Sequence, residues 1–174
     1  MKTIEEIYAG YPEIPYVSKD RDVQDWLENP EKYPYKKVEK SQMVRLKEGI
    51  LPGDLILLWR IGFNNFTTES VIPNYFEYRY GVDSRESVAL LMQLGMIRMG
   101  TSIETLDIIA VPILKKILEG NGLKKGGNRE EILARVLDNV SEGDIGTYFT
   151  QRRYVILEKG RKTLDDNYDI ILKH

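Results

Sequence analysis

Residues 106–140 read LDIIAVPILKKILEGNGLKKGGNREEILARVLDNV, and this stretch constrains the fold of the chain more than any other. Pro112 suits the first turn of a helix, because the N–H that proline lacks would be unpaired there anyway. Gly120 and Gly122 predict the end of that helix, since glycine accepts the left-handed backbone found at helix ends. Asn128 is a good N-cap for a second helix, and Glu131, three residues later, fits a capping box. The sequence therefore predicts a helix, a glycine-bearing loop and a second helix.

Each predicted helix has one apolar face. The apolar residues that form these faces recur at helical spacing. They are Leu114, Ile117 and Leu118 in the first helix and Ile132, Leu133, Val136, Leu137 and Val140 in the second. The two faces are expected to meet as a helical hairpin. Because so few residues bury little surface, we expect the hairpin to need support from the rest of the chain.

The same stretch resembles a SAP domain, a helix–extended loop–helix module associated with binding DNA and sometimes RNA. The positions that match the family pattern, in order, are Val111, Leu114-Lys115, Leu118, Gly122-Leu123, Gly127, Asn128-Arg129, Glu131-Ile132 and Arg135. Two positions depart from it, since Ala110 stands where the family often has Ser or Thr and Asn128 replaces the first of two basic residues. The chain also looks like uncharacterised SAP-containing phage and prophage proteins of Gram-positive bacteria.

The resemblance implies a non-catalytic protein that binds DNA weakly and with little sequence preference. The residues implied in binding surround the loop and are Lys115, Lys124, Lys125, Gly127, Asn128, Arg129 and Arg135. At the start of a helix, backbone N–H groups and basic side chains can both meet phosphate. The acidic residues of this region equal the basic ones in number, whereas nucleic-acid modules usually have a positive excess. The alternative function is therefore a protein-interaction or structural adaptor, for example in a virion, in which the hairpin is only a packing unit.

Two other basic regions are expected to be solvated surface, with a binding patch as the alternative. One lies between Gln151 and Thr163 and contains Arg152, Arg153, Lys159, Arg161 and Lys162. The other lies in the N-terminal part and contains Lys36, Lys37, Lys40, Arg45 and Lys47. A nearby aromatic group is expected to be core rather than a base-stacking platform, and consists of Tyr75, Phe76, Tyr78 and Tyr80.

Four segments are expected along the chain, and the fold class is mainly α with short β hairpins, that is, α+β. They are a Tyr/Pro-rich segment packed on the body (1–50), a winged-helix-like unit (51–105), the SAP-like domain (106–140) and a C-terminal strand–helix segment (141–174).

Within the second and fourth segments, turn and cap residues predict individual elements. Helices are expected after Pro52, after a cap at Thr67 and after a cap at Ser84, followed by a strand at 96–99 that turns at Gly100 into a hairpin. In the last segment we expect a strand at 153–157, a turn at Gly160 and a helix at 161–172.

The residue types restrict the chemistry. The chain has no cysteine, which excludes disulfides, thiolate catalysis and cysteine-based zinc sites. The single histidine is His174, so a Ser-His-Asp triad is not expected. No glycine-rich phosphate loop follows a predicted strand, and no carboxylate spacing indicates an acid–base pair or a metal cage. We therefore expect no enzyme activity, no metal and no cofactor.

Charge and hydropathy restrict the partners and the location. Twenty-five basic against 27 acidic residues give a net charge of -2, so any basic surface must be local. No run approaches the ~20 apolar residues that span a bilayer, and the start MKTIEEIYAG lacks the apolar run of a signal peptide. We expect a cytoplasmic protein of a bacterial host cell, or a virion component, with no membrane partner. DNA is the expected partner, with RNA or another protein as alternatives.

Overall fold

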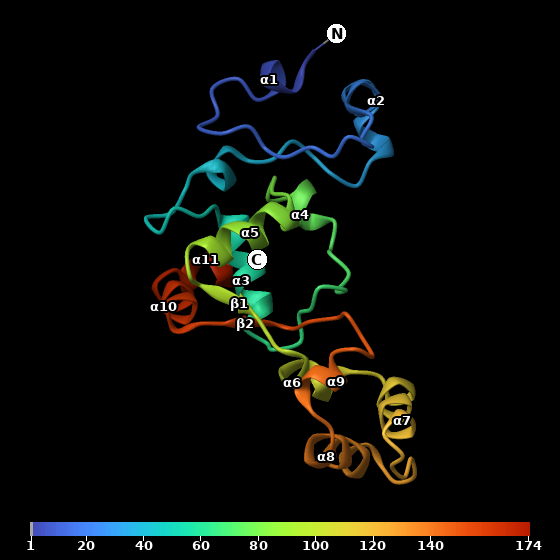
Figure 1. The fold of residues 1–174 in the computed structure, drawn as a ribbon. Coiled ribbons are helices and arrows are strands. Elements are labelled where there is room, and N and C mark those ends of the chain that lie inside the picture. Colours follow the sequence, from blue (N-terminus) through green and yellow to red (C-terminus); the bar gives the residue numbers. More distant parts are fainter. Residues whose placement is uncertain (1) are drawn as a thin grey trace. The chain divides into compact units, whose positions relative to one another are not determined.

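The computed structural model describes residues 2–174 and is mainly helical (Figure 1). The α-helices are α1 Ile4–Ile7, α2 Val23–Glu28, α3 Pro52–Ile61, α4 Tyr75–Tyr78, α5 Ser84–Gln93, α6 Ser102–Thr105, α7 Val111–Gly120, α8 Arg129–Asn139, α9 Glu142–Ile145, α10 Glu158–Asp166 and α11 Tyr168–Leu172. Short 3-10 helices are η1 Pro30–Lys32, η2 Lys40–Met43 and η3 Leu106–Ile108. The strands β1 Ile97–Met99 and β2 Tyr154–Ile156 form a small sheet. The expected fold class, mainly α with a little β, is confirmed.

The two strands pair antiparallel although they lie far apart in the sequence. The Gly100 N–H donates to the Arg153 carbonyl at 2.6 Å, and the Leu157 N–H donates to the Met96 carbonyl at 2.9 Å. The sheet is therefore not the local hairpin expected at Gly100. The reason is a capping box directly after that glycine, in which Thr101 and Glu104 each accept a backbone N–H from the other and start α6.

The chain folds into two compact units, and their boundaries do not follow the four expected segments. Unit 1 comprises residues 2–62, 71–97 and 156–174, and unit 2 comprises residues 63–70 and 98–155. The segments 51–105 and 141–174 are both divided between the units, because the chain passes from one unit to the other within β1 and within β2. The segment 106–140, in which the sequence predicts the helical hairpin, lies wholly in unit 2.

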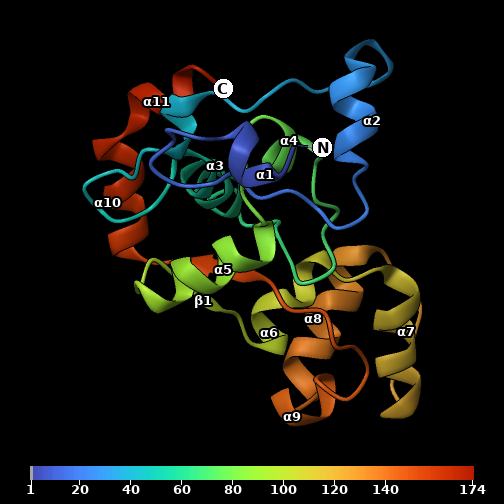
Figure 2. The same cartoon turned by 90° about the horizontal axis from the view of Figure 1, so that it is seen from above.

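Unit 1 is built around α3. This helix begins with Pro52, and the Asp54 carboxylate accepts the Leu51 N–H at 2.8 Å, which caps the first turn. Leu55, Ile56, Leu57, Leu58 and Ile61 are fully buried, and only Trp59 and Arg60 of this helix are partly exposed, so most of its surface is enclosed. Helices α5, α10 and α11 pack against it (Figure 2).

A buried arginine joins the N-terminal segment to the rest of unit 1. The Arg21 guanidinium lies 3.8 Å above the ring of Tyr35 and contacts the Glu77 carboxylate at 3.3 Å, with only 4% of its side chain exposed. The Ser18 N–H donates to the other oxygen of Glu77 at 2.8 Å. Stacking and ion pairing together therefore fix residues 18–21 against α4.

One helix prediction and one turn prediction are wrong, and one helix cap is displaced by a residue. The single helix expected at 161–172 is divided into α10 and α11. No helix is capped by Thr67 within the described chain, because residues 66–68 run beside β2 instead, with Thr67 bridged to Arg153. Gly160 does not form a turn but lies inside α10, where a Cβ would clash with the Met96 carbonyl. The cap of α5 is Asp83, one residue before the predicted Ser84.

Candidate nucleic-acid interface

Helix α7 begins and ends as the sequence predicts. Pro112 occupies its first turn, after Ala110 at the N-cap. At the other end Gly122 adopts a φ of 68°, the Leu123 N–H donates to the Leu118 carbonyl at 2.8 Å, and the Gly122 N–H donates to the Glu119 carbonyl at 3.1 Å. These two bonds form a Schellman motif, which turns the chain back across the last turns of α7.

Helix α8 follows the loop and lies against α7 (Figures 1 and 2). The Asn128 side chain accepts the Glu131 N–H at 2.9 Å, as expected of the predicted cap. The apolar faces meet in a core with the residues that flank the hairpin, namely Leu106, Ile109, Leu114, Ile117, Leu118, Ile132, Val136, Val140, Ile145 and Phe149. Leu133 packs against this core, but Leu137 is 45% exposed, so the predicted second stripe is narrower than expected.

Two of the predicted DNA-binding arginines hold backbone carbonyls. Arg135 donates through Nη1 to the carbonyls of Lys124 at 2.6 Å and Gly126 at 2.9 Å, which fixes the shape of the loop. Arg129 donates through Nη2 to the carbonyl of Asp107. Both side chains are partly buried. Their hydrogen bonds position the hairpin, and leave less of each guanidinium available to a phosphate than the resemblance implies.

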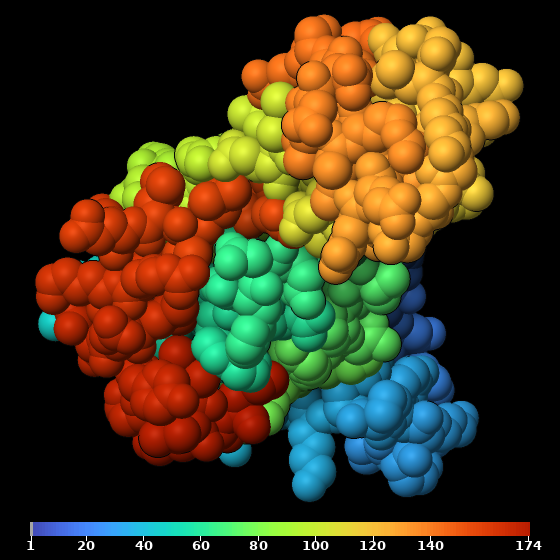
Figure 3. Space-filling model, turned by 90° about the horizontal axis from the view of Figure 1, so that it is seen from below, coloured from blue at the N-terminus to red at the C-terminus, as the bar shows by residue number. Residues whose placement is uncertain are grey.

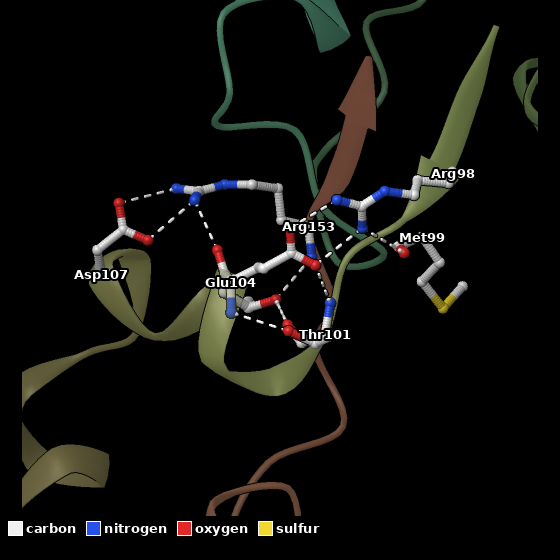
Figure 4. Close-up of polar contacts among 7 residues, drawn as sticks. Arg98, Met99, Thr101, Glu104, Asp107 and Arg153 are labelled. Atoms are coloured by element: carbon white, nitrogen blue, oxygen red, sulfur yellow. Dashed lines mark hydrogen bonds and ion pairs between the residues drawn. The ribbon is translucent and has the colours of Figure 1, made fainter. Parts of the chain in front are cut away.

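A polar network at the start of unit 2 engages another predicted residue, Arg153 (Figure 4). Its guanidinium donates to the Asp107 carboxylate, with Nη1 2.9 Å from Oδ1, and to the Glu104 carbonyl at 2.6 Å. Beside Arg153, the Arg98 guanidinium donates two hydrogen bonds, of 2.7 and 2.8 Å, to the Glu104 carboxylate. The hydrogen bonds from Arg98 and from the backbone N–H of Thr101 lower the pKa of Glu104 to about 2.

The remaining residues of the second basic window are divided between the units. Arg152 lies in unit 2 and donates to the carbonyls of Phe149 at 3.0 Å and Gln151 at 2.8 Å. Lys159, Arg161 and Lys162 lie in unit 1, where Lys159 donates to the Leu94 carbonyl and Lys162 pairs with Asp166 at 2.9 Å. The structure therefore does not bring these five residues together within one unit.

Three lysines of the hairpin line one shallow hollow, and a fourth lies next to one of its lining residues. Lys115, Lys116 and Lys125 line it together with Val111, Pro112, Glu119 and Gly126, and a Cβ on Gly126 would lie 3.6 Å from the side chain of Lys124. We call the four exposed residues Lys115, Lys116, Lys124 and Lys125 the lysine cluster. Glu119 opposes it and contacts Lys125 at 3.5 Å. The hairpin surface is yellow to orange in Figure 3.

The structure also revises the roles of the remaining predicted site residues. Gly127 has a φ of 116°, and a Cβ there would approach the Glu131 carboxylate to 2.8 Å, so this glycine is needed for the shape of the loop. Asn128 is engaged as the cap of α8. Lys116 was absent from the sequence-based site, although the chain reversal at Gly122 indicates that the loop lysines return toward α7.

Comparison with protein-family models, with curated proteins and with solved structures found no match to this chain. Within residues 2–174, every helix is too short or too polar to span a bilayer. In the same part of the chain, no three His, Cys, Asp or Glu side chains lie close enough together to hold a metal ion.

Proposed function

We propose that this protein is a non-catalytic nucleic-acid-binding protein whose SAP-like hairpin binds DNA through the lysine cluster. The observation that supports the proposal most is that three exposed lysines of α7 and the following loop line one hollow, where Glu119 is the single carboxylate. The fourth lysine, Lys124, lies next to the lining residue Gly126. A local positive surface of this kind attracts phosphate although the whole chain is slightly acidic.

The expected contact lies on the side of α7 and the loop rather than at the first turn of α8. Glu130 and Glu131 stand in that first turn, where they stabilise the helix dipole and repel a phosphate. Arg129 and Arg135 hold the carbonyls described above. We therefore assign these two arginines to positioning the loop and the lysine cluster to contacting phosphate.

The same chemistry explains why we expect binding to be weak and tolerant of sequence. A lysine ammonium is a flexible point charge, which meets phosphate oxygens without the fixed fork that reads a base edge. Few phosphates can be neutralised by one hairpin, so the affinity should be modest and strongly dependent on salt. The resemblance to phage and prophage proteins supports a cytoplasmic role in a bacterial host cell, and RNA is the alternative polymer.

The proposal is tested by fluorescence anisotropy with a short labelled DNA duplex at low salt. The cluster variant changes four residues to Gln, namely Lys115, Lys116, Lys124 and Lys125. Its matched control makes the same charge change at exposed lysines of unit 1, namely Lys2, Lys19, Lys40 and Lys173. We expect the cluster variant to lose duplex binding and the control to retain most of it.

Two results would contradict the proposal. Equal binding by the cluster variant and the wild type would show that the contact lies elsewhere. No binding by the wild type at low salt would instead favour the adaptor function, in which the hairpin is a packing unit and the balanced charge of the chain reflects an ordinary surface.

A further inference from the structure

Unit 1 has a hollow of about 400 Å³ that is lined by both basic and aromatic side chains. Three tyrosines line it, Tyr35, Tyr75 and Tyr78, and three cations stand with them, Lys36, Lys37 and Arg79. The only carboxylate in its lining is that of Glu39. Small-molecule sites typically measure ~300–1,000 Å³, so this hollow suits a unit of about one nucleotide better than a folded partner.

The cations are exposed and two of them are held in place. The Lys37 ammonium lies 5.2 Å from the ring centre of Tyr11, and Arg79 donates through Nη2 to the Lys173 carbonyl at 2.9 Å. Lys36 is exposed beside them. With Glu39 as the one opposing charge, the rim has a positive excess and favours an anionic ligand.

The tyrosine rings form a rigid wall. Tyr35 and Tyr78 stack with ring centres 4.2 Å apart, and the guanidinium of Arg21 covers Tyr35 at 3.8 Å. The Tyr75 hydroxyl accepts a hydrogen bond from Arg60 at 3.1 Å, which fixes that ring. Tyr75 and Tyr78 remain partly exposed. Rings that are already ordered lose little conformational entropy when a flat ligand stacks on them.

We propose that this hollow binds single-stranded nucleic acid, with a base against Tyr75 and Tyr78 and a backbone phosphate at Lys36, Lys37 or Arg79. Stacking on tyrosine together with basic side chains is the usual chemistry of sequence-tolerant single-strand binding. The site goes beyond the proposed function, because it lies in unit 1, needs no residue of the hairpin and requires an unstacked base, which a duplex does not offer.

The test measures the anisotropy of fluorescein-labelled oligothymidine across a salt series. One variant combines Lys36→Gln with Lys37→Gln, and its control combines Lys19→Gln with Lys40→Gln, both exposed and outside the hollow. Each single-strand phosphate contact contributes ~0.7 to the slope of log affinity against log salt, so the first variant should lower the slope by about 0.7 for the one backbone phosphate that the hollow takes. The control should keep the wild-type slope.

A second pair of variants tests the aromatic wall. Tyr78→Phe keeps the ring and should retain oligothymidine binding, whereas Tyr78→Leu removes the ring and should weaken binding several-fold. Circular dichroism melts of both verify that they are folded. Ultraviolet cross-linking of an oligothymidine that contains 5-iododeoxyuridine, followed by peptide mapping, should label Tyr75 or Tyr78.

Further measurements distinguish this inference from the proposal that the hairpin binds DNA. The cluster variant of the hairpin should still bind oligothymidine. Loss of that binding in the cluster variant, or cross-links confined to residues 111–126, would assign the strand to the hairpin and overturn the inference. Oligothymidine binding that is absent in the wild type, or unchanged by the Lys36/Lys37 pair, would overturn it as well. If thymidine monophosphate competed for the hollow as well as oligothymidine does, the ligand would be a free nucleotide, and binding of a strand would be contradicted.

Discussion

Truncation of Leu118 to Ala should destabilise unit 2 more than any charge change in the hairpin. Leu118 is fully buried, within the core that α7 and α8 share. Burial of a leucine side chain contributes about 1.5–3 kcal/mol, and the cavity left behind adds ~24 cal/mol for each Å³ that the neighbours do not refill. Since rigid helices on both sides limit collapse, we expect a loss of about 3 kcal/mol, inside the usual range of ~2–5 kcal/mol.

The assay is a thermal melt of Leu118→Ala beside Lys125→Ala. A loss of 3 kcal/mol corresponds to a melting temperature lower by roughly 6–12 °C in a chain of this size. Lys125 is exposed and forms a solvent-exposed ion pair with Glu119 at 3.5 Å, so Lys125→Ala should lower the free energy of unfolding by less than ~1 kcal/mol. Equal melting temperatures for the two variants would refute the assignment of Leu118 to the shared core.

Three other outcomes are expected. Arg98 lowers the pKa of Glu104 from 4.5 to about 2, so the ionised carboxylate stabilises the folded protein above pH 4.5, and this stabilisation is lost as the pH falls toward 2. Glu104→Gln should remove ~1 kcal/mol of this acid dependence from the free energy of unfolding measured in urea. An unchanged pH profile would contradict this expectation. Gly160→Ala should lower the melting temperature, because its Cβ would meet the Met96 carbonyl, whereas Gly143→Ala, which meets nothing, should not. Elemental analysis of the purified protein should find no stoichiometric metal, given the absence of cysteine, and stoichiometric zinc or iron would show that prediction to be wrong.

The parts of the fold that the sequence predicted correctly are those specified by local signals. Pro112, Gly122 and Asn128 each determine the backbone of their own turn, so the bounds of α7 and α8 follow from a few residues. The same holds for α3 after Pro52. Local capping and turn chemistry acts over three or four residues, which is the range that a single sequence reveals.

The parts that the sequence did not predict depend on contacts between distant residues. Thr67 has the sequence signal of a helix cap, but its segment pairs with Arg153 beside β2. Strand β1 likewise pairs with β2, which follows the helical hairpin in the sequence. A strand's periodicity does not identify its partner. The enclosure of Arg21 by Tyr35 and Glu77 is equally invisible in the sequence, because three separate segments supply the groups.

The sequence predicted the exposed residues of the candidate site but not the hydrogen bonds that engage some of its side chains, because those bonds join distant residues. Lys115 is a position of the family pattern, Lys124 and Lys125 are basic residues of the predicted loop, and all three are exposed. Arg129 and Arg135 were chosen from the same pattern, yet the structure engages both with carbonyls of preceding segments. Which carbonyls a glycine-rich loop leaves unpaired depends on its three-dimensional path, and the sequence pattern does not contain that information.

The salt dependence of duplex binding tests the central proposal most directly. Each phosphate neutralised on duplex DNA contributes ~0.9 to the slope of log affinity against log salt, so contacts from all four residues of the lysine cluster would give a slope of about -3.6. Changing the cluster to Gln should bring the slope close to zero and leave the melting temperature nearly unchanged, since exposed charges contribute little to stability. Arg129→Gln alone should leave the slope as in the wild type. An unchanged slope in the cluster variant, or no duplex binding by the wild type at low salt, would contradict DNA binding by this hairpin.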